Sequence, residues 1–529
     1  MSRFIGWRHP SFIGGPMWLV ALAAALLPFL FVTIPPLVDA PGHLGQFAIQ
    51  LAGSDSPLRR YFGFDWGLKL NLGTDLLIEA LAPWLGLTRA FWLLVAIIPV
   101  LTVAAIWRLA RALNPCAAAA SWALPFAYSY PFNYGFLNYT LTTALSLLGF
   151  ALWVELAGRP RLREALFWPL MPLLLVFHAV GGLLLPILIG ASALMRHVRF
   201  VPHAPYVAAD RASLRAFAAE VRPIAGAALL VVAWKLNQPP SGLETSYSLK
   251  AKFNAIALGL RDQSRWLDVA SMAAILAVPL IGWRLGARYT RHTGALAITL
   301  VLLFLVMPSQ MDGASFCDMR LFPAVMIAIL ALQDWSPVPR RAARAIAIGG
   351  LALFLVRIAA ATAGFVGYER SYAAELPALE QVERGSRVLA FVTRPCRAWQ
   401  NWRTTRLDHL PAMASVTREA WVNAHWDVGD IHLMQIRYRP SPVFYNDPTQ
   451  FVWSQACVDR QKEPPRTAEQ WRVRRRTIAD VMPDLPLDKV DYLWLIQARL
   501  PDGPWSRRLV PVWSHGGSAL YRIAPAPPA

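Results

Sequence analysis

The chain has 529 residues, 56% of them hydrophobic, with a mean hydropathy of +0.39 and a formal net charge of +19. A soluble protein of this length needs more polar surface, so the composition excludes an ordinary soluble enzyme. The arginines cluster in short segments between apolar runs rather than in one patch interleaved with aromatic residues. This distribution indicates membrane orientation signals and no nucleic-acid partner.

Long apolar runs recur through the first 365 residues, each close to the roughly 20 residues that cross a hydrocarbon core. We therefore predict a polytopic α-helical membrane protein. The first run follows the basic segment MSRFIGWRHP and has no small-residue cleavage site. We interpret it as a retained helix with its N-terminal end in the cytoplasm, and not as a removed signal peptide.

Arginine-rich flanks orient the spans that follow. The short run GTDLLIEALAPWLGL (73–87) would place every later arginine cluster outside if it crossed the membrane. It is therefore predicted to lie on the outer surface as a juxtamembrane helix. The remaining runs predict about eleven spans, at residues 16–35, 89–107, 116–132, 137–157, 164–179, 181–195, 222–237, 267–283, 293–307, 321–333 and 345–365.

The character of the chain changes near residue 366. Alternating runs at 386–393, 491–498 and 518–525 predict strands, and the stretch 468–482 is compatible with a helix. We expect a membrane domain over 1–365 and an extracytoplasmic α/β domain over 366–529.

The four cysteines are too few and too scattered for a metal or disulfide framework. Cys396 and Cys457 both fall in the tail. They can pair if the tail lies outside the cytoplasm, and two unrelated free thiols are the alternative.

This topology gathers polar residues from several loops at one depth, the outer face of the membrane. That gathering predicts a functional site there. The candidates are Asp39, His43, Asp75, Asn138, His178, Lys250, Lys252, Arg261, Asp318 and Arg320.

Asp39 follows the first span and precedes Ala-Pro-Gly. As a helix cap it would begin an interfacial helix with Pro41 in its first turn. As a cavity residue it would act as a general base or help hold a metal ion, with His43 one turn further on the same side. The two roles are compatible.

Arg320 lies on the predicted outer side, against the positive-inside bias. A guanidinium there suits a phosphate, to which it donates two parallel hydrogen bonds. Asp318 would orient it or bind substrate, and a local Asp–Arg ion pair is the alternative.

The outer loop with Lys250, Lys252 and Arg261 is basic as well. It predicts a lipid-phosphate site or simple contact with lipid head groups. His178 and Asn138 are the less specific candidates, because polar and aromatic residues at this depth are common in the interfacial belt.

The chain resembles the GT-C-type glycosyltransferases, polytopic enzymes that use polyprenyl-phosphate-linked sugars. The first helix ending in VDAPGH, the surface helix after it, the pattern GFLNYTLTTALSLLGFAL and the late loop ending in CDMRLFP carry the resemblance. It implies that Asp39 is the catalytic base or a metal ligand, and that Arg320, with Lys250 or Lys252, binds phosphate. Many members have two adjacent acids in the first loop, so the need for a divalent cation stays open here.

The predicted function is transfer of a sugar from a polyprenyl-phosphate donor to a glycan, lipid or protein acceptor at the periplasmic face of a bacterial inner membrane. The predicted partners are therefore the membrane lipid, the lipid-linked donor and the acceptor. A transporter or flippase of lipid-linked saccharides and a noncatalytic scaffold for envelope assembly are the alternatives.

Overall fold

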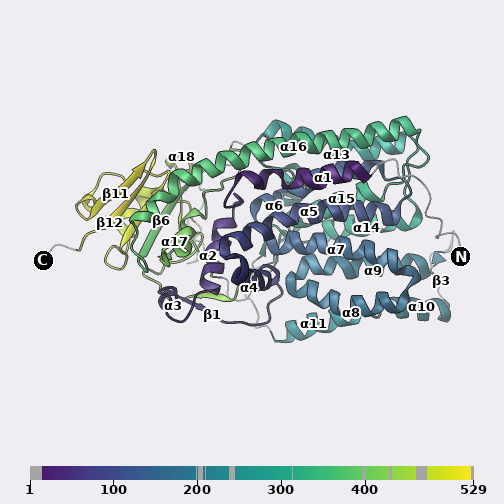
Figure 1. The fold of residues 1–529 in the computed structure, drawn as a ribbon, viewed down its shortest axis with the longest axis horizontal. Helices are drawn as coiled ribbons and strands as arrows, with labels where there is room; N and C mark the ends of the chain where they lie inside the picture. Colours follow the sequence, from purple (N-terminus) through teal and green to yellow (C-terminus); the bar gives the residue numbers. More distant parts are fainter. Residues whose placement is uncertain are drawn as a thin grey trace.

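The computed structural model describes residues 15–197, 199–200, 207–208, 210–237, 245–311, 314–396, 401–427, 432–459 and 474–525. Within them the chain forms a bundle of apolar helices with a small mixed sheet at one end (Figure 1).

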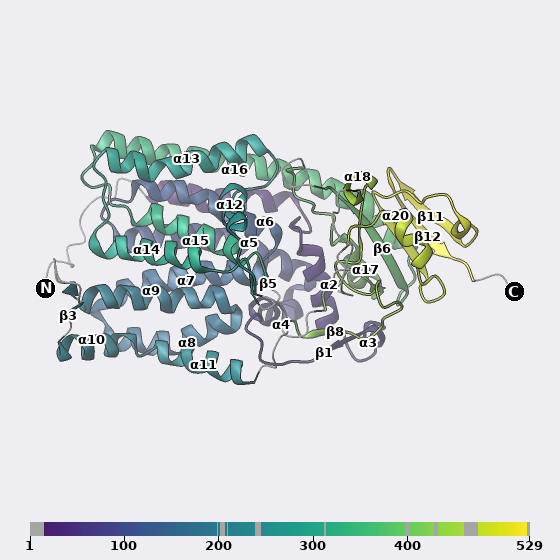
Figure 2. The ribbon, with the colours of Figure 1, turned by 180° about the vertical axis from the view of Figure 1, so that it is seen from behind.

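Helical segments occupy all the ranges predicted as spans, and they run side by side in the bundle (Figures 1 and 2). They are α1 (Gly15–Leu26) with η1 (Leu27–Phe31), α5 (Leu87–Leu113), η2 (Ala118–Tyr128), α7 (Leu137–Glu155), α8 (Pro160–Phe177), α9 (Ala179–His197), α11 (Ile224–Leu236), α13 (Arg265–Arg284), α14 (Arg291–Val306), α15 (Cys317–Leu332) and α16 (Arg340–Glu375).

Five helices of the described chain are long and apolar enough to cross a membrane: α5, α7, α9, α13 and α16. A sixth is added if α10 (Arg211–Val221) and α11, bent by 64° at their junction, form one span. The other segments are shorter or less apolar, so the number of spans stays a prediction.

The outer surface of the bundle is apolar. Leu19, Leu229, Leu280, Trp283 and Val306 are each more than 60% exposed to solvent in the isolated chain. Exposure of large apolar side chains on this scale is typical of a surface that contacts lipid.

Two short helices lie between the bundle and the sheet, as Figure 1 shows. They are α2 (Ala40–Gln50) and α4 (Gly73–Leu85), which occupy the stretches expected to form interfacial helices. The long helix α16 runs along the bundle and continues past residue 366 to Glu375, beside the sheet. The position of the predicted domain boundary stays a prediction.

The sheet contains the three predicted strands, found at β6 (Arg387–Arg394), β10 (Tyr492–Ile496) and β12 (Ser518–Ile523). β6 pairs in parallel with β10, β7 (Trp421–Val422) and β9 (Phe451–Trp453). β12 pairs antiparallel with β10 and β11 (Leu509–His515). In the predicted helical stretch 468–482, residues 468–473 lie outside the described residues and α20 covers Ile478–Val481.

The tail is joined tightly to the membrane part. β1 (Phe62–Phe64) pairs antiparallel with β8 (Met434–Ile436), and Ile49 and Phe62 enter the apolar core of the tail. Cys396 and Cys457 form a disulfide, so the free-thiol alternative is wrong. These connections hold the loops at this end of the bundle against the tail, and the candidate site lies along this seam.

Candidate functional site

Asp39 lies between η1 and α2, at the end of the bundle that faces the tail. Its backbone N–H donates to Tyr134 O at 2.8 Å, which ties the loop to the turn before α7. Asp39 occupies the N-cap position of α2, but its side chain accepts no capping hydrogen bond from the described residues. Asp39 as a residue is 8% exposed. Because its carboxyl group does not cap the helix, that group can act on something other than the helix end.

Gly135 allows the loop before α7 to approach Asp39 closely. Its φ of +109° is in the left-handed region that favours glycine, and a Cβ there would lie 2.8 Å from Asp39 Cβ. His43 Nε2 lies 3.1 Å from Gly135 O. The loop before α7 thus packs against Asp39 on one side and His43 on the other.

Residues of the tail complete the surroundings of Asp39. His409 Nε2 lies 3.5 Å from Asp39 Oδ1, and His409 Nδ1 lies 3.8 Å from Asp447 Oδ1. Next to them Arg394 Nε pairs with Asp408 Oδ2 at 2.9 Å. None of these four residues was predicted from the sequence. The only signal was the Asp-His pair formed by Asp408 and His409 within the stretch RLDHLPAM.

Burial dominates the electrostatics of this cluster. It raises the pKa of Asp39 well above the ordinary value; the carboxylate of Asp447 adds to the rise, and the charge of Arg320 opposes it. Burial also raises the pKa of Asp447 to about 6 and lowers the pKa of His409 to about 4. At neutral pH the imidazole of His409 is therefore uncharged.

Arg320 lies one turn into α15 and acts electrostatically on Asp39. Its guanidinium carbon stands 3.7 Å from the centre of the Phe136 ring, and its Nε is buried with no acceptor among the described residues. Among the described residues no carboxylate pairs with it. The Asp–Arg pair considered from the sequence is absent there, because Asp318 pairs with Lys252 at 3.4 Å instead.

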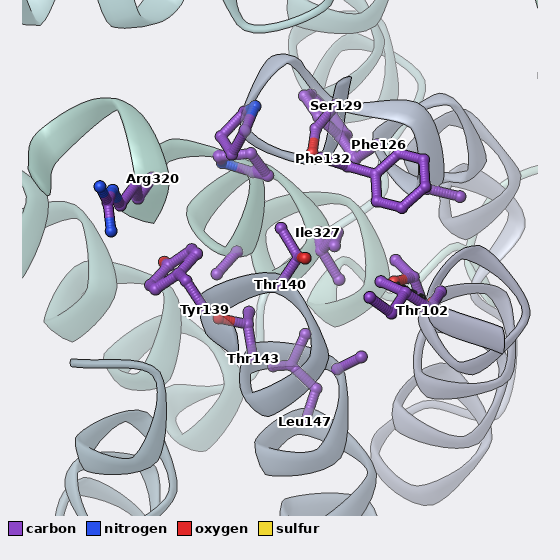
Figure 3. A pocket seen from close by; sticks show the side chains of 16 residues that line it. Thr102, Phe126, Ser129, Phe132, Tyr139, Thr140, Thr143, Leu147, Arg320 and Ile327 are labelled. Atoms are coloured by element: carbon purple, nitrogen blue, oxygen red, sulfur yellow. Dashed lines mark hydrogen bonds between the residues drawn. The ribbon is translucent and has the colours of Figure 1, made fainter. Parts of the chain in front are cut away.

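A cavity opens beside Arg320 inside the bundle (Figure 3). Residues of α5, η2, α7 and α15 line it, and Figure 3 shows the Tyr139 ring next to the Arg320 side chain. The other lining groups are apolar or hydroxyl-bearing, including Thr102, Thr140 and Thr143. Among the described residues that line this cavity, Arg320 alone carries a charge.

Of the other predicted residues, three line a second cavity and one lies near Arg320. His43, Asp75 and Asn138 line a second cavity at the seam. His178 lies near Arg320, with its ring 5.3 Å from that of Tyr139.

Arg261 and Lys250 are not part of either cavity. Arg261 is buried and donates to the carbonyl oxygens of Trp402, at 2.7 Å, and of Asn401, at 3.1 Å. It therefore joins the bundle to the tail. Lys250 is exposed at the start of α12 (Leu249–Leu258). Within the described residues no three His, Cys, Asp or Glu side chains are grouped as a metal site would need.

Comparison with known proteins gives no family assignment: no family model and no curated protein matches the chain. It is similar to two crystal structures of ArnT from Cupriavidus metallidurans at 12% sequence identity. The apo structure has a TM-score of 0.47 and covers 96% of this chain and 97% of that one. The structure bound to undecaprenyl phosphate has a TM-score of 0.48 and covers 96% and 98%. Likeness at this level leaves the function to be argued from the site.

Proposed function

We propose that the protein is a membrane glycosyltransferase of the GT-C type, which transfers a sugar from a polyprenyl-phosphate-linked donor to an acceptor hydroxyl group. The observation that carries the proposal is the placement of Arg320. Its buried guanidinium has no anionic partner among the described residues, borders a cavity within the helix bundle and acts on the carboxyl group of Asp39.

A buried cation without an anion is costly, so the site favours a ligand that brings negative charge. A phosphate accepts parallel hydrogen bonds from a guanidinium, which fits the donors of Arg320. Because the cavity lies among apolar helices, a phosphate carried on a lipid reaches it more readily than a free anion does. The lipid chain would lie along the bundle and the sugar would face the seam.

The residues then divide the chemistry. The acceptor oxygen attacks C1 of the sugar, and the bond from C1 to the phosphate oxygen breaks as the polyprenyl phosphate leaves. Arg320 stabilises the negative charge on the departing phosphate. Asp39 accepts the proton of the acceptor hydroxyl. Burial raises the pKa of its carboxyl group, which makes the deprotonated carboxylate a stronger base than an exposed one.

We place this reaction at the periplasmic face of a bacterial inner membrane. The Cys396–Cys457 disulfide supports a tail outside the cytoplasm, because disulfides persist in oxidising compartments. The arginine flanks favour the same orientation. We assign no step to a divalent cation.

The test is reconstitution in proteoliposomes with synthetic polyprenyl-phosphate hexoses and pentoses that carry a labelled sugar. A transferase releases free polyprenyl phosphate and moves the label to an acceptor or to water. Movement of intact donor across the bilayer without cleavage would contradict the proposal and favour a flippase. Neither cleavage nor movement with any donor would favour a scaffold.

A further inference from the structure

The second cavity lies at the seam between the bundle and the tail. α2 contributes His43 and Gln46 to its wall, α4 contributes Asp75, and α7 contributes Asn138. The tail closes it with His432, just before β8. Because β1 and β8 pair across this seam, both parts of the protein hold the cavity in shape.

Hydrogen bonds fix the polar wall. Asn138 Oδ1 accepts from the backbone N–H of Thr74 at 2.5 Å, and its Nδ2 donates to Asn71 O at 2.8 Å. Gln50 Nε2 donates to Asp75 O at 3.0 Å. These contacts hold the segment before α4 and the start of α7 in place, as a preformed binding site requires.

Two polar groups of the wall are left without partners. Gln46 Nε2 and His432 Nδ1 are buried and make no hydrogen bond within the described residues. A buried donor or acceptor left unpaired costs about 1–3 kcal/mol, so both favour a ligand with hydrogen-bonding groups. Phe47 and Phe64 supply apolar faces in the same cavity.

The charge of the cavity selects against anions. Burial lowers the pKa values of His43 and His432 to about 4 each, so both imidazoles are neutral at pH 7. His43 Nε2 donates its hydrogen to Gly135 O, which leaves Nδ1 of that ring as an acceptor, whereas His432 offers one donor and one acceptor. Burial raises the pKa of Asp75 to about 6. No lysine or arginine is among the described lining residues, and Lys69 acts on His432 from outside that lining.

The cavity is adjacent to the proposed reacting carboxyl group. The His43 N–H donates to Asp39 O at 3.0 Å, so the His43 side chain stands one helical turn from the proposed base. Its ring contacts Gly135 O on the side toward Asp39. His43 therefore joins the wall of the cavity to the loop that carries Asp39.

We propose that this cavity is the acceptor subsite and binds an uncharged sugar residue, an inference that rests on the proposed transferase function. Hydroxyl groups pair with the neutral imidazoles, the Gln46 amide and the Asp75 carboxyl group, and the phenylalanine rings cover an apolar sugar face. A phosphorylated or carboxylated sugar finds no cation in the described lining and is rejected.

The experiment measures binding of methyl hexosides, and of the corresponding hexose 6-phosphates, to the full chain in nanodiscs by saturation-transfer NMR. Polyprenyl phosphate binding is measured on the same samples. The variants are Gln46→Leu and His432→Phe, with His432→Asn to restore a polar atom near Nδ1. Gln455→Leu, at an exposed position of α18 (Gln455–Val458), is the matched control.

We expect a neutral hexoside to bind and its 6-phosphate not to bind. Gln46→Leu and His432→Phe should weaken the hexoside about tenfold, as loss of one hydrogen bond to a buried group predicts. His432→Asn and Gln455→Leu should stay near wild type, and polyprenyl phosphate binding should be unchanged throughout.

Equal binding of the phosphorylated sugars, or hexoside binding unaffected by the two variants, would overturn the inference. So would the absence of hexoside binding in a wild-type protein that still binds polyprenyl phosphate, and this outcome leaves the transferase proposal standing. Hexoside binding without any polyprenyl phosphate binding would support the saccharide cavity and contradict the transferase.

Discussion

His409 Nε2 lies 3.5 Å from Asp39 Oδ1, which brings the tail into contact with the loop between η1 and α2. Asp447 lies on the other side of the same imidazole. The tail therefore forms part of the proposed site and sets the electrostatic environment of the carboxyl group that we assign as the base.

Replacement of that carboxyl group is the simplest prediction. Asp39→Asn should lower the transfer rate by a factor of about 10²–10⁴, the usual contribution of a general base, because the amide cannot accept the proton of the acceptor hydroxyl. Expression and thermal stability should stay close to wild type. Asp55→Asn, at an exposed position of the same loop region, should retain full activity. Retained activity in Asp39→Asn would remove it as the base.

The pH dependence of the rate follows from the neighbours of Asp39. The base acts when deprotonated, so the rate rises with pH through the raised pKa of Asp39. The charge of Asp447 helps raise the pKa of Asp39. Asp447→Asn therefore lowers the pKa of Asp39 and moves the acidic limb of the pH–rate profile to lower pH. Arg394 lowers the same pKa, so Arg394→Gln moves the limb to higher pH. Shifts in the same direction for both variants would contradict the assignment.

Gly135 should tolerate no side chain. Gly135→Ala places a Cβ 2.8 Å from Asp39 Cβ and forces a non-glycine residue to a φ of +109°. Backbone strain of this kind costs about 1–3 kcal/mol, and the clash displaces Asp39 as well. Gly86→Ala is the matched control, since Gly86 has a φ of +75° and open space around its would-be Cβ. We expect both variants to lose stability and only Gly135→Ala to lose transfer activity. Equal activity in the two would show that Asp39 does not depend on this contact.

A buried ion pair joins two helices of the bundle below the tail. Arg357 Nη1 on α16 pairs with Asp268 Oδ1 on α13 at 2.8 Å, and Trp402 Nε1 of the tail donates to Asp268 Oδ2 at 2.6 Å. Asp268→Ala leaves the guanidinium buried without its carboxylate, which costs about 3–5 kcal/mol. A thermal-unfolding assay in detergent measures the loss.

The control for this ion pair is Asp488→Ala. It breaks the pair between Arg508 and an Asp488 side chain that is 75% exposed, and should cost less than about 1 kcal/mol. Similar losses of stability in the two variants would contradict the prediction that the buried ion pair between α13 and α16 stabilises the bundle more than an exposed pair does.

Hydrophobic run length and alternation are local signals, and they located the bundle helices and the strands β6, β10 and β12. The prediction that α4 lies at the membrane interface followed from charge bias alone. The surroundings of Asp39 were not predictable in this way. His409 and Asp447 reach it through the long-range packing of the tail, and a single sequence carries no periodic signal for such contacts. The same limit hid the pairing of Lys252 with Asp318, which leaves Arg320 without a carboxylate partner among the described residues.

The most direct test of the central claim is binding of a polyprenyl phosphate to the purified protein in nanodiscs. Arg320→Ala is compared with Arg284→Ala, which removes an exposed arginine at the end of α13. We predict saturable binding that Arg320→Ala weakens by roughly 10–100-fold, as loss of charge-assisted hydrogen bonds to a phosphate implies, and that Arg284→Ala leaves unchanged. Equal affinity in both variants, or no saturable binding in the wild type, would contradict a lipid-phosphate site at Arg320.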